Sequence, residues 1–210
     1  MSDPAESARD DLAFVRALVS ESGQVQTSLG QALLAGGVCY GVQCLLQAFL
    51  ATGVKVPIAV HLTVGILPTL VFLVAITWIT MRDKDNSRHS VGTRAIQAAF
   101  GGGGLAALTT AIIFGYLTYR TQDMATWLLH PIMICVVQGT VWYIAFAVRR
   151  QGWFGLVSAG WFATSLVLAY MLGTGNVKLI SLFVLVLAFA LLGLMALPGW
   201  VLMRSGARQG

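Results

Sequence analysis

Six long apolar stretches, separated by short polar segments, dominate this amino-acid sequence. Each stretch is close to the ~20 residues that a helix needs to cross a lipid bilayer. Lipid offers the backbone no hydrogen-bond partners, so a chain crosses it only as a structure that satisfies itself, such as a helix. We therefore predict an all-α integral membrane protein with six transmembrane helices, at about residues 30–52, 57–81, 95–118, 124–148, 154–173 and 178–203.

Composition excludes an ordinary soluble domain. The chain has 210 residues, of which 57% are hydrophobic and 10% are charged, whereas roughly a quarter of the residues of a soluble domain are charged. The net charge of +5 does not indicate a nucleic-acid partner, because the basic residues stand at the ends of the apolar stretches rather than in one patch. The expected partner is the lipid bilayer.

The polar segment Met81–Arg94 connects the second and third stretches, and six of its fourteen residues are Asp, Lys or Arg. Basic residues favour the cytoplasmic side of a membrane protein. Three basic residues lie on the side opposite to the chain ends: Lys55, Arg120 and Lys178. Ten lie on the side of this segment and both ends: Arg9, Arg16, Arg82, Lys84, Arg88, Arg94, Arg149, Arg150, Arg204 and Arg208. We therefore expect a bacterial-type inner-membrane protein with both termini in the cytoplasm.

The N-terminal segment, residues 1–28, is expected to be cytoplasmic and to precede a transmembrane domain at 29–210. Apolar residues recur at helical spacing between residues 5 and 24, which predicts a short amphipathic helix. Ser20, Ser22 and Gly23 interrupt this pattern, so we expect the helix to end there. This helix and the 81–94 loop are the expected surfaces for a protein partner.

The first and third helical hairpins resemble each other. Ala51–Arg82 and Gly173–Arg204 each contain Thr-Gly and then Val-Lys at the outer turn, and each closes with Trp-x-x-Met-Arg. One interpretation is internal duplication, giving three parallel two-helix hairpins. The alternative is convergence, since every helix that ends at the inner surface favours an aromatic residue and an Arg there.

Small residues four positions apart recur in the odd-numbered stretches. Such spacing lets helix backbones approach closely in lipid, so we expect these helices to lie inside the bundle, or one of them to form a homodimer face. The residues concerned are Gly37, Gly41, Ala99, Gly103, Ala107, Ala111, Gly115, Gly155, Ala159 and Ala163.

Polar but neutral side chains within the stretches, most of them toward the outer side, are the candidate ligand-binding residues: Gln43, Gln47, His61, His130 and Gln138. One hypothesis is that they line an outward-facing pocket for a small neutral solute. A second is that His61 and His130 serve as the axial ligands of haem b or as a pair of metal ligands. In the third, each imidazole simply bonds to a neighbouring helix or reaches the interface.

The segments of the sequence that resemble catalytic motifs each lack a residue that the motif requires. Ser158 in Gly155–Ser158 is followed by no His that would act as its base. The Gly101–Gly104 run lacks the Lys-Ser/Thr of a phosphate-binding loop, and no carboxylate lies at mid-membrane depth to drive an ion pump. The sequence favours a non-enzymatic accessory or sensor-type membrane protein without metal or cofactor. The alternatives are a passive carrier or channel and a haem-binding redox protein.

The predicted orientation is tested by labelling cysteines in intact cells with a membrane-impermeant maleimide. Gln122→Cys, in an outer turn, should label directly, whereas Ser87→Cys, in the 81–94 loop, should label only after permeabilisation. The three native cysteines all lie within apolar stretches, and the unsubstituted protein measures their background. The reverse accessibility pattern would contradict the orientation.

Overall fold

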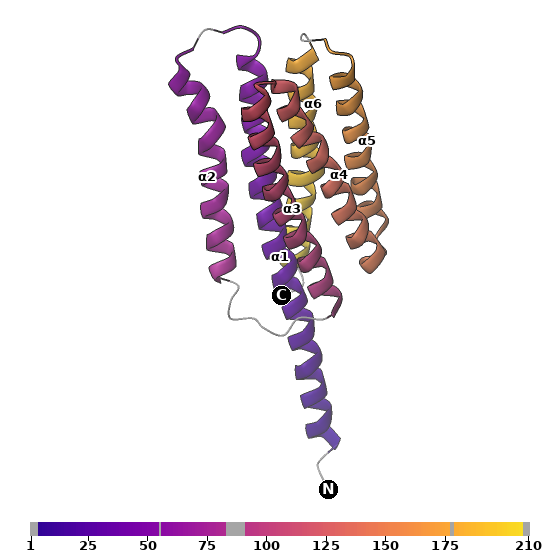
Figure 1. Cartoon of the computed structure of the whole chain (residues 1–210). Coiled ribbons are helices and arrows are strands. Elements are labelled where there is room, and N and C mark those ends of the chain that lie inside the picture. Colours follow the sequence, from indigo (N-terminus) through magenta and orange to yellow (C-terminus); the bar gives the residue numbers. More distant parts are fainter. Residues whose placement is uncertain (1–3, 55, 83–90, 177–178, 208–210) are drawn as a thin grey trace.

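The computed structural model describes residues 4–54, 56–82, 91–176 and 179–207, and it is helical throughout these ranges except in the short turns (Figure 1). Six helical spans are long and apolar enough to cross a membrane, as predicted. A short π-helical segment, η2, joins α6 to α7, and these three form the sixth span. The helices are α1 (Pro4–Leu50), α2 (Ile58–Arg82), α3 (Val91–Thr121), α4 (Met124–Arg149), α5 (Gly152–Gly173), α6 (Leu179–Leu191), η2 (Leu192–Ala196) and α7 (Leu197–Ala207).

Helix α1 corrects the prediction of a short, separate N-terminal helix. It runs without a break from Pro4 to Leu50 and passes straight through the Ser20–Gly23 segment. Serine and glycine cost a helix at most about 1 kcal/mol per residue, and no proline here removes a backbone donor. The N-terminal segment and the first span are therefore one helix. The other predicted interruption, the 81–94 loop, has residues 83–90 outside the described ranges.

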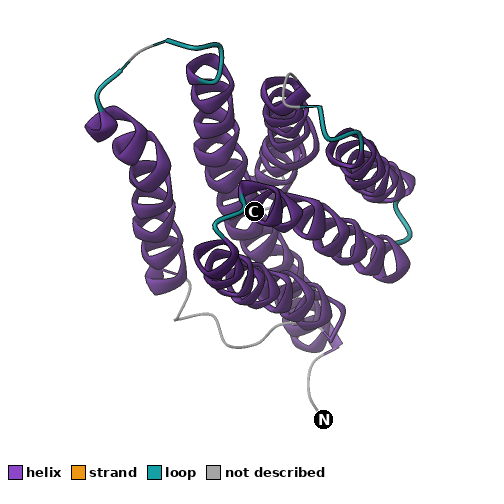
Figure 2. Ribbon diagram, turned by 45° about the horizontal axis from the view of Figure 1, so that its top comes forward, coloured by secondary structure: helices purple, strands orange, loops and turns teal. Residues whose placement is uncertain are grey.

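The helices do not pack simply as three hairpins. Partners within each predicted hairpin do touch, but α1 also packs along α6, η2 and α7, and α4 packs along both α3 and α5. Helix α2 packs along α1 and stands at the edge of the bundle in both views (Figures 1 and 2). The extensive contacts between the first and last spans close the bundle.

The two similar outer turns have the same local structure. Gly53 and Gly175 both adopt positive φ, at 96° and 65°, a conformation that glycine reaches without a steric penalty. The preceding threonines, Thr52 and Thr174, each donate a 2.7 Å hydrogen bond to the carbonyl three residues earlier. These bonds satisfy carbonyls that the helix end leaves free. The shared Thr-Gly therefore ends a helix in the same way twice.

The shared Trp-x-x-Met-Arg ending is also explained locally. The guanidinium of Arg82 lies 5.6 Å from the ring of Trp78, and that of Arg204 lies 3.9 Å from the ring of Trp200. Residues four apart meet on one helix face, where a cation over an aromatic ring is stabilised. Both ends thus gain the same contact, which convergence and duplication explain equally well.

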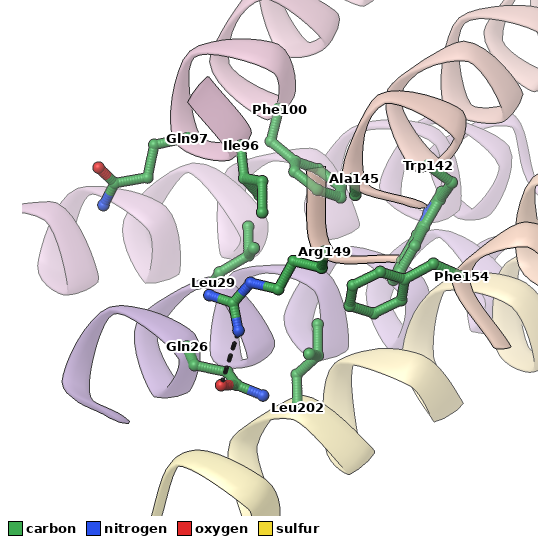
Figure 3. Close-up of a pocket in the computed structure, with 10 residues that line it drawn as sticks. All are labelled: Gln26, Leu29, Ile96, Gln97, Phe100, Trp142, Ala145, Arg149, Phe154 and Leu202. Carbon is green, nitrogen blue, oxygen red and sulfur yellow. Dashed lines mark hydrogen bonds between the residues drawn. The ribbon is translucent and has the colours of Figure 1, made fainter. Parts of the chain in front are cut away.

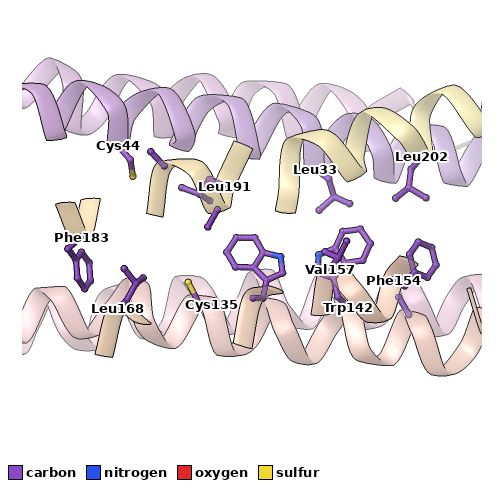
Figure 4. Packing of buried hydrophobic residues seen from close by; sticks show 14 of the residues in the cluster. Leu33, Cys44, Cys135, Trp142, Phe154, Val157, Leu168, Phe183, Leu191 and Leu202 are labelled. Carbon is purple, nitrogen blue, oxygen red and sulfur yellow. The ribbon is translucent and has the colours of Figure 1, made fainter. Parts of the chain in front are cut away.

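The core centres on two fully buried tryptophans, Trp142 of α4 and Trp161 of α5 (Figure 4). Pro198 of α7 is also fully buried. Proline has no N–H, so the carbonyl of Leu194, four residues earlier, lacks its usual helical donor. The indole N–H of Trp161 donates to that carbonyl across 3.2 Å. A side chain of α5 thus completes the hydrogen bonding of the sixth span.

Glycines allow α1 to contact the sixth span backbone to backbone. A Cβ added to Gly30 would lie 2.6 Å from the carbonyl oxygen of Gly199, and one added to Gly199 would lie 2.5 Å from the backbone nitrogen of Leu34. A Cβ on Gly37 would collide with the backbone of Ala196, and one on Gly41 with the side chain of Leu192. Gly37 and Gly41, which their spacing predicted to allow close packing, thus lie where α1 meets the sixth span.

The small residues of α3 and α5 are only partly at interfaces. Gly103 of α3 is buried against Val141 of α4, and Ala99, Ala107, Ala111 and Gly115 are half-buried. Besides Gly103, only Ile96 is buried among the described side chains of α3, whereas about a third are buried in the most apolar parts of α1 and α5, because α3 packs mainly on α4. The prediction that all odd-numbered helices lie inside is wrong for α3.

In α5 the predicted stripe itself faces outward. Ala159 and Ala163 are exposed, and Gly155 is half-buried beside Phe146. Gly160 packs against Leu194 instead, and the large side chains of Trp161 and Leu168 fill the core: Trp142, Trp161, Leu168, Pro198 and Cys135 are its largest fully buried residues. Small size alone did not identify the packed face, because bulky aromatic residues occupy it.

Substituting one glycine at a time tests the close approach of α1. Gly37→Ala should destabilise the protein by about 1–3 kcal/mol, the usual cost of overpacking, because the added methyl meets backbone rather than a movable side chain. Gly102→Ala is the matched control, since a Cβ there meets nothing within 4 Å. Unfolding in detergent, followed by circular dichroism, compares the two, and equal stabilities would contradict the packing.

A double-mutant cycle tests the bond between Trp161 and Leu194. Trp161→Phe removes the indole donor, whereas Pro198→Ala supplies a backbone N–H that is able to bond to the same carbonyl. The substitution of Trp161 should therefore cost less in the Pro198→Ala background, by roughly 0.5–1.5 kcal/mol. The loss of ring volume is the same in both backgrounds and cancels. Strictly additive stabilities would show that the indole bond contributes nothing.

Candidate functional site

The polar residues predicted to line an outer pocket are separated by the fold. The amide nitrogen of Gln43 donates to the carbonyl of Gly65 in α2 at 3.1 Å, close to Pro68, which removes a donor from that helix. Gln47 and His61 are exposed. Gln43 therefore joins α1 to α2, and its neighbours do not enclose a cavity with it.

His130 belongs to a different pair of helices. Its ring stacks on Trp127 with 5.1 Å between centroids and lies 6.4 Å from the ring of Phe114 in α3. Its Nε2 is buried and has no hydrogen-bond partner among the described residues. Since His61 is exposed on α2, at the edge of the bundle, the two imidazoles do not face each other across a haem-shaped gap.

Gln138 and Trp142 lie one turn apart on α4. The side-chain oxygen of Gln138 and the indole nitrogen of Trp142 are both buried, and neither has a partner among the described residues. Among all the residues that the structure describes, no cluster of three or more His, Cys, Asp or Glu residues is placed to hold a metal ion. The five predicted polar residues thus occupy separate positions, and the structure does not bring them together.

A pocket lies instead at the other end of the bundle, and we call it the Arg149 pocket (Figure 3). Its volume of about 20 Å³ accommodates about one water molecule. Side chains from α1, α3, α4, α5 and α7 contribute to its wall, so it lies where five helices meet. The lining residues are Gln26, Leu29, Ile96, Gln97, Phe100, Trp142, Ala145, Arg149, Phe154 and Leu202.

Arg149 is the only charged residue in this lining. Its guanidinium is half-buried and donates to the side-chain oxygen of Gln26 at 3.3 Å, and Gln26 itself is only 8% exposed. Figure 3 shows both side chains turned toward each other between α1 and α4. Gln26, Gln97 and Trp142 also carry N–H donors. The walls of the cavity itself are apolar, and the guanidinium lies at its edge beside Gln26.

The chemistry of this lining is that of binding. The described residues of the lining include no Ser, Cys, His or carboxylate, so none of them is a typical nucleophile or general base. A guanidinium with spare donors binds an anion or an oxygen-rich polar group.

Sequence reasoning did not single out this pocket. Arg149 entered only as one of ten basic residues that set the orientation, and Gln26 fell in the segment predicted to precede the membrane domain. Their contact joins residues 123 positions apart, and no local pattern reveals such a pair. One signal was present in the sequence. The helical spacing of the first span continues from Leu33 back through Leu29 to Gln26, before the predicted start of that span.

Comparison of the chain with protein-family models, with characterised proteins and with solved structures finds no match.

Proposed function

We propose that the chain is a non-enzymatic accessory or sensor-type protein of a bacterial-type inner membrane, which acts by binding a soluble protein in the cytoplasm. The binding surface is the N-terminal part of α1, residues 4–25, which we call the arm, together with the 81–94 loop. This assignment rests on the proposed orientation, in which both termini are cytoplasmic. Both termini do lie at the same end of the bundle (Figure 1).

The observation that carries the proposal is the length of α1. Its 47 residues greatly exceed the ~20 that a membrane requires, and the first long apolar stretch of the sequence starts only near residue 30. The arm is helical and extends beyond the bundle (Figure 1). At 1.5 Å per residue it is roughly 33 Å long, which places a large helical surface in the aqueous phase.

The helix that bears the arm is also the one that the bundle holds most closely. Helix α1 packs along α2, α6, η2 and α7, and Gly30 and Gly37 bring its backbone against that of the sixth span. A continuous helix transmits tilt and rotation along its axis because its backbone hydrogen bonds are unbroken. A partner bound to the arm is therefore coupled mechanically to the membrane domain.

The sequence of the arm indicates the chemistry of its partner. Leu12, Val15 and Val19 fall three or four residues apart, the spacing with which an amphipathic helix enters an apolar groove. Four acidic residues and two basic ones accompany them: Glu6, Asp10, Asp11 and Glu21, with Arg9 and Arg16. The partner surface that fits is an apolar groove with a basic rim.

The proposal is tested by chemical crosslinking in native membranes, followed by mass spectrometry of the proteins attached to the chain. Val15→Asp places a charge within the apolar stripe of the arm and should abolish a specific crosslinked partner. Ala13→Asp adds the same charge at a position about 160° around the helix, on the opposite face, and should leave that partner in place. Expression of both variants in the membrane is the control for folding.

Two outcomes would contradict the proposal. One is that the unsubstituted chain yields no crosslinked protein that contacts the arm. The other is that Val15→Asp and Ala13→Asp reduce the crosslink equally, because a helix in a groove discriminates between its faces.

A further inference from the structure

We propose that the Arg149 pocket is a binding site for a phosphate group at the membrane surface, of the kind that anionic lipid headgroups carry. The site consists of the Arg149 guanidinium at the mouth of the pocket, with Gln26 beside it and apolar side chains below. It is independent of the partner proposed for the arm.

The first argument is the number of unused donors. A guanidinium has five N–H groups in a rigid planar fork, and the contact to Gln26 uses one of them. At 3.3 Å that contact is longer than the usual 2.7–3.2 Å range, so an anion displaces it at little cost. No other hydrogen bond from Arg149 to a described side chain is present. Phosphate matches the remaining fork in a bidentate arrangement.

The second argument is the surroundings of the charge. Arg149 is half-buried against walls that include Leu29, Phe154 and Leu202, so solvent screens its charge less than that of a free surface residue. The cavity below has room for about one water molecule, too little for a phosphate. The phosphate therefore binds outside this cavity, against the guanidinium of Arg149.

The third argument is the distribution of charge along the bundle. The described side chains at this end include five arginines, at positions 82, 94, 149, 150 and 204. Asp123 is the only carboxylate among all described side chains, and it caps α4 at the opposite end. Arginines at the ends of spans lie at headgroup depth, where basic pockets between transmembrane helices bind anionic headgroups. In the full sequence, ten Lys and Arg against seven Asp and Glu are predicted on this side, so the net charge there stays positive and suits an anionic ligand.

Binding there has a structural consequence. Gln26 of α1 donates no charge to the site but holds the Arg149 side chain through its oxygen. Occupation of the site therefore exchanges one contact between α1 and α4 for one between α4 and the ligand, while the packing of α1 on the sixth span stays in place.

Native mass spectrometry of the purified full chain tests the site, with phosphatidylglycerol and phosphatidylcholine supplied together in equal amounts. The unsubstituted protein should retain phosphatidylglycerol preferentially. Arg149→Gln should weaken that preference about fivefold, since one basic residue contributes roughly that factor near an anionic surface. Arg150→Asn is the matched control: it removes one charge at an exposed neighbouring position whose left-handed φ of 53° asparagine tolerates.

A second experiment identifies the source of the phosphate. Inorganic phosphate is titrated against the protein in a detergent containing phosphatidylcholine alone, and thermal unfolding is followed. Stabilisation that Arg149→Gln abolishes assigns the site to free phosphate. A preference for phosphatidylglycerol without this stabilisation assigns it to a lipid headgroup.

Equal retention of phosphatidylglycerol by Arg149→Gln and Arg150→Asn would overturn the proposal. If Arg149→Gln does not yield folded protein, Gln26→Leu replaces it. That variant frees the whole guanidinium fork, so the retention of phosphatidylglycerol should stay the same or rise. A fall to the level of phosphatidylcholine would equally overturn the proposal.

Discussion

An unpaired backbone polar group within lipid costs several kcal/mol of free energy, and the whole structure depends on avoiding that cost. Prolines interrupt the helical hydrogen bonding of three spans, at Pro68, Pro131 and Pro198, and close to two of them a neighbouring helix supplies a donor. Trp161 of α5 donates to the Leu194 carbonyl that Pro198 leaves free, and Gln43 of α1 donates to Gly65, three residues before Pro68. Each of these two side chains also joins its own helix to the interrupted one, so a bond missing within a span is accompanied by a bond between spans.

Close approach of backbones is the second determinant of the bundle. Helices in lipid gain little from burying apolar surface and associate through packing instead. The glycines of α1 lie directly against the sixth span, whereas α2 and α3 lack contacts of that closeness and stand at the edges. Because α1 is both the most closely held helix and the one that extends beyond the bundle, movement of the arm and packing of the core are linked.

Polar groups are placed according to what each can bond to, and this separates structural residues from a candidate site. Gln43 joins helices, and His130 packs between Trp127 and α3, so their positions are explained by packing. Arg149 differs because it keeps donors in reserve beside apolar walls. Its contact with Gln26 joins α4 to α1.

The sequence by itself determined the membrane class and the six helical spans, because the length and apolarity of each stretch leave lipid as its only environment. It also determined the outer turns, since the Thr-Gly pairs carry their own hydrogen bonds and positive φ. Only the tertiary structure decided which helices lie inside, that α1 passes unbroken through Ser20–Gly23, and that Gln26 meets Arg149. Those features depend on contacts between residues far apart in the chain, and helical periodicity records which residues share a face but not what that face meets.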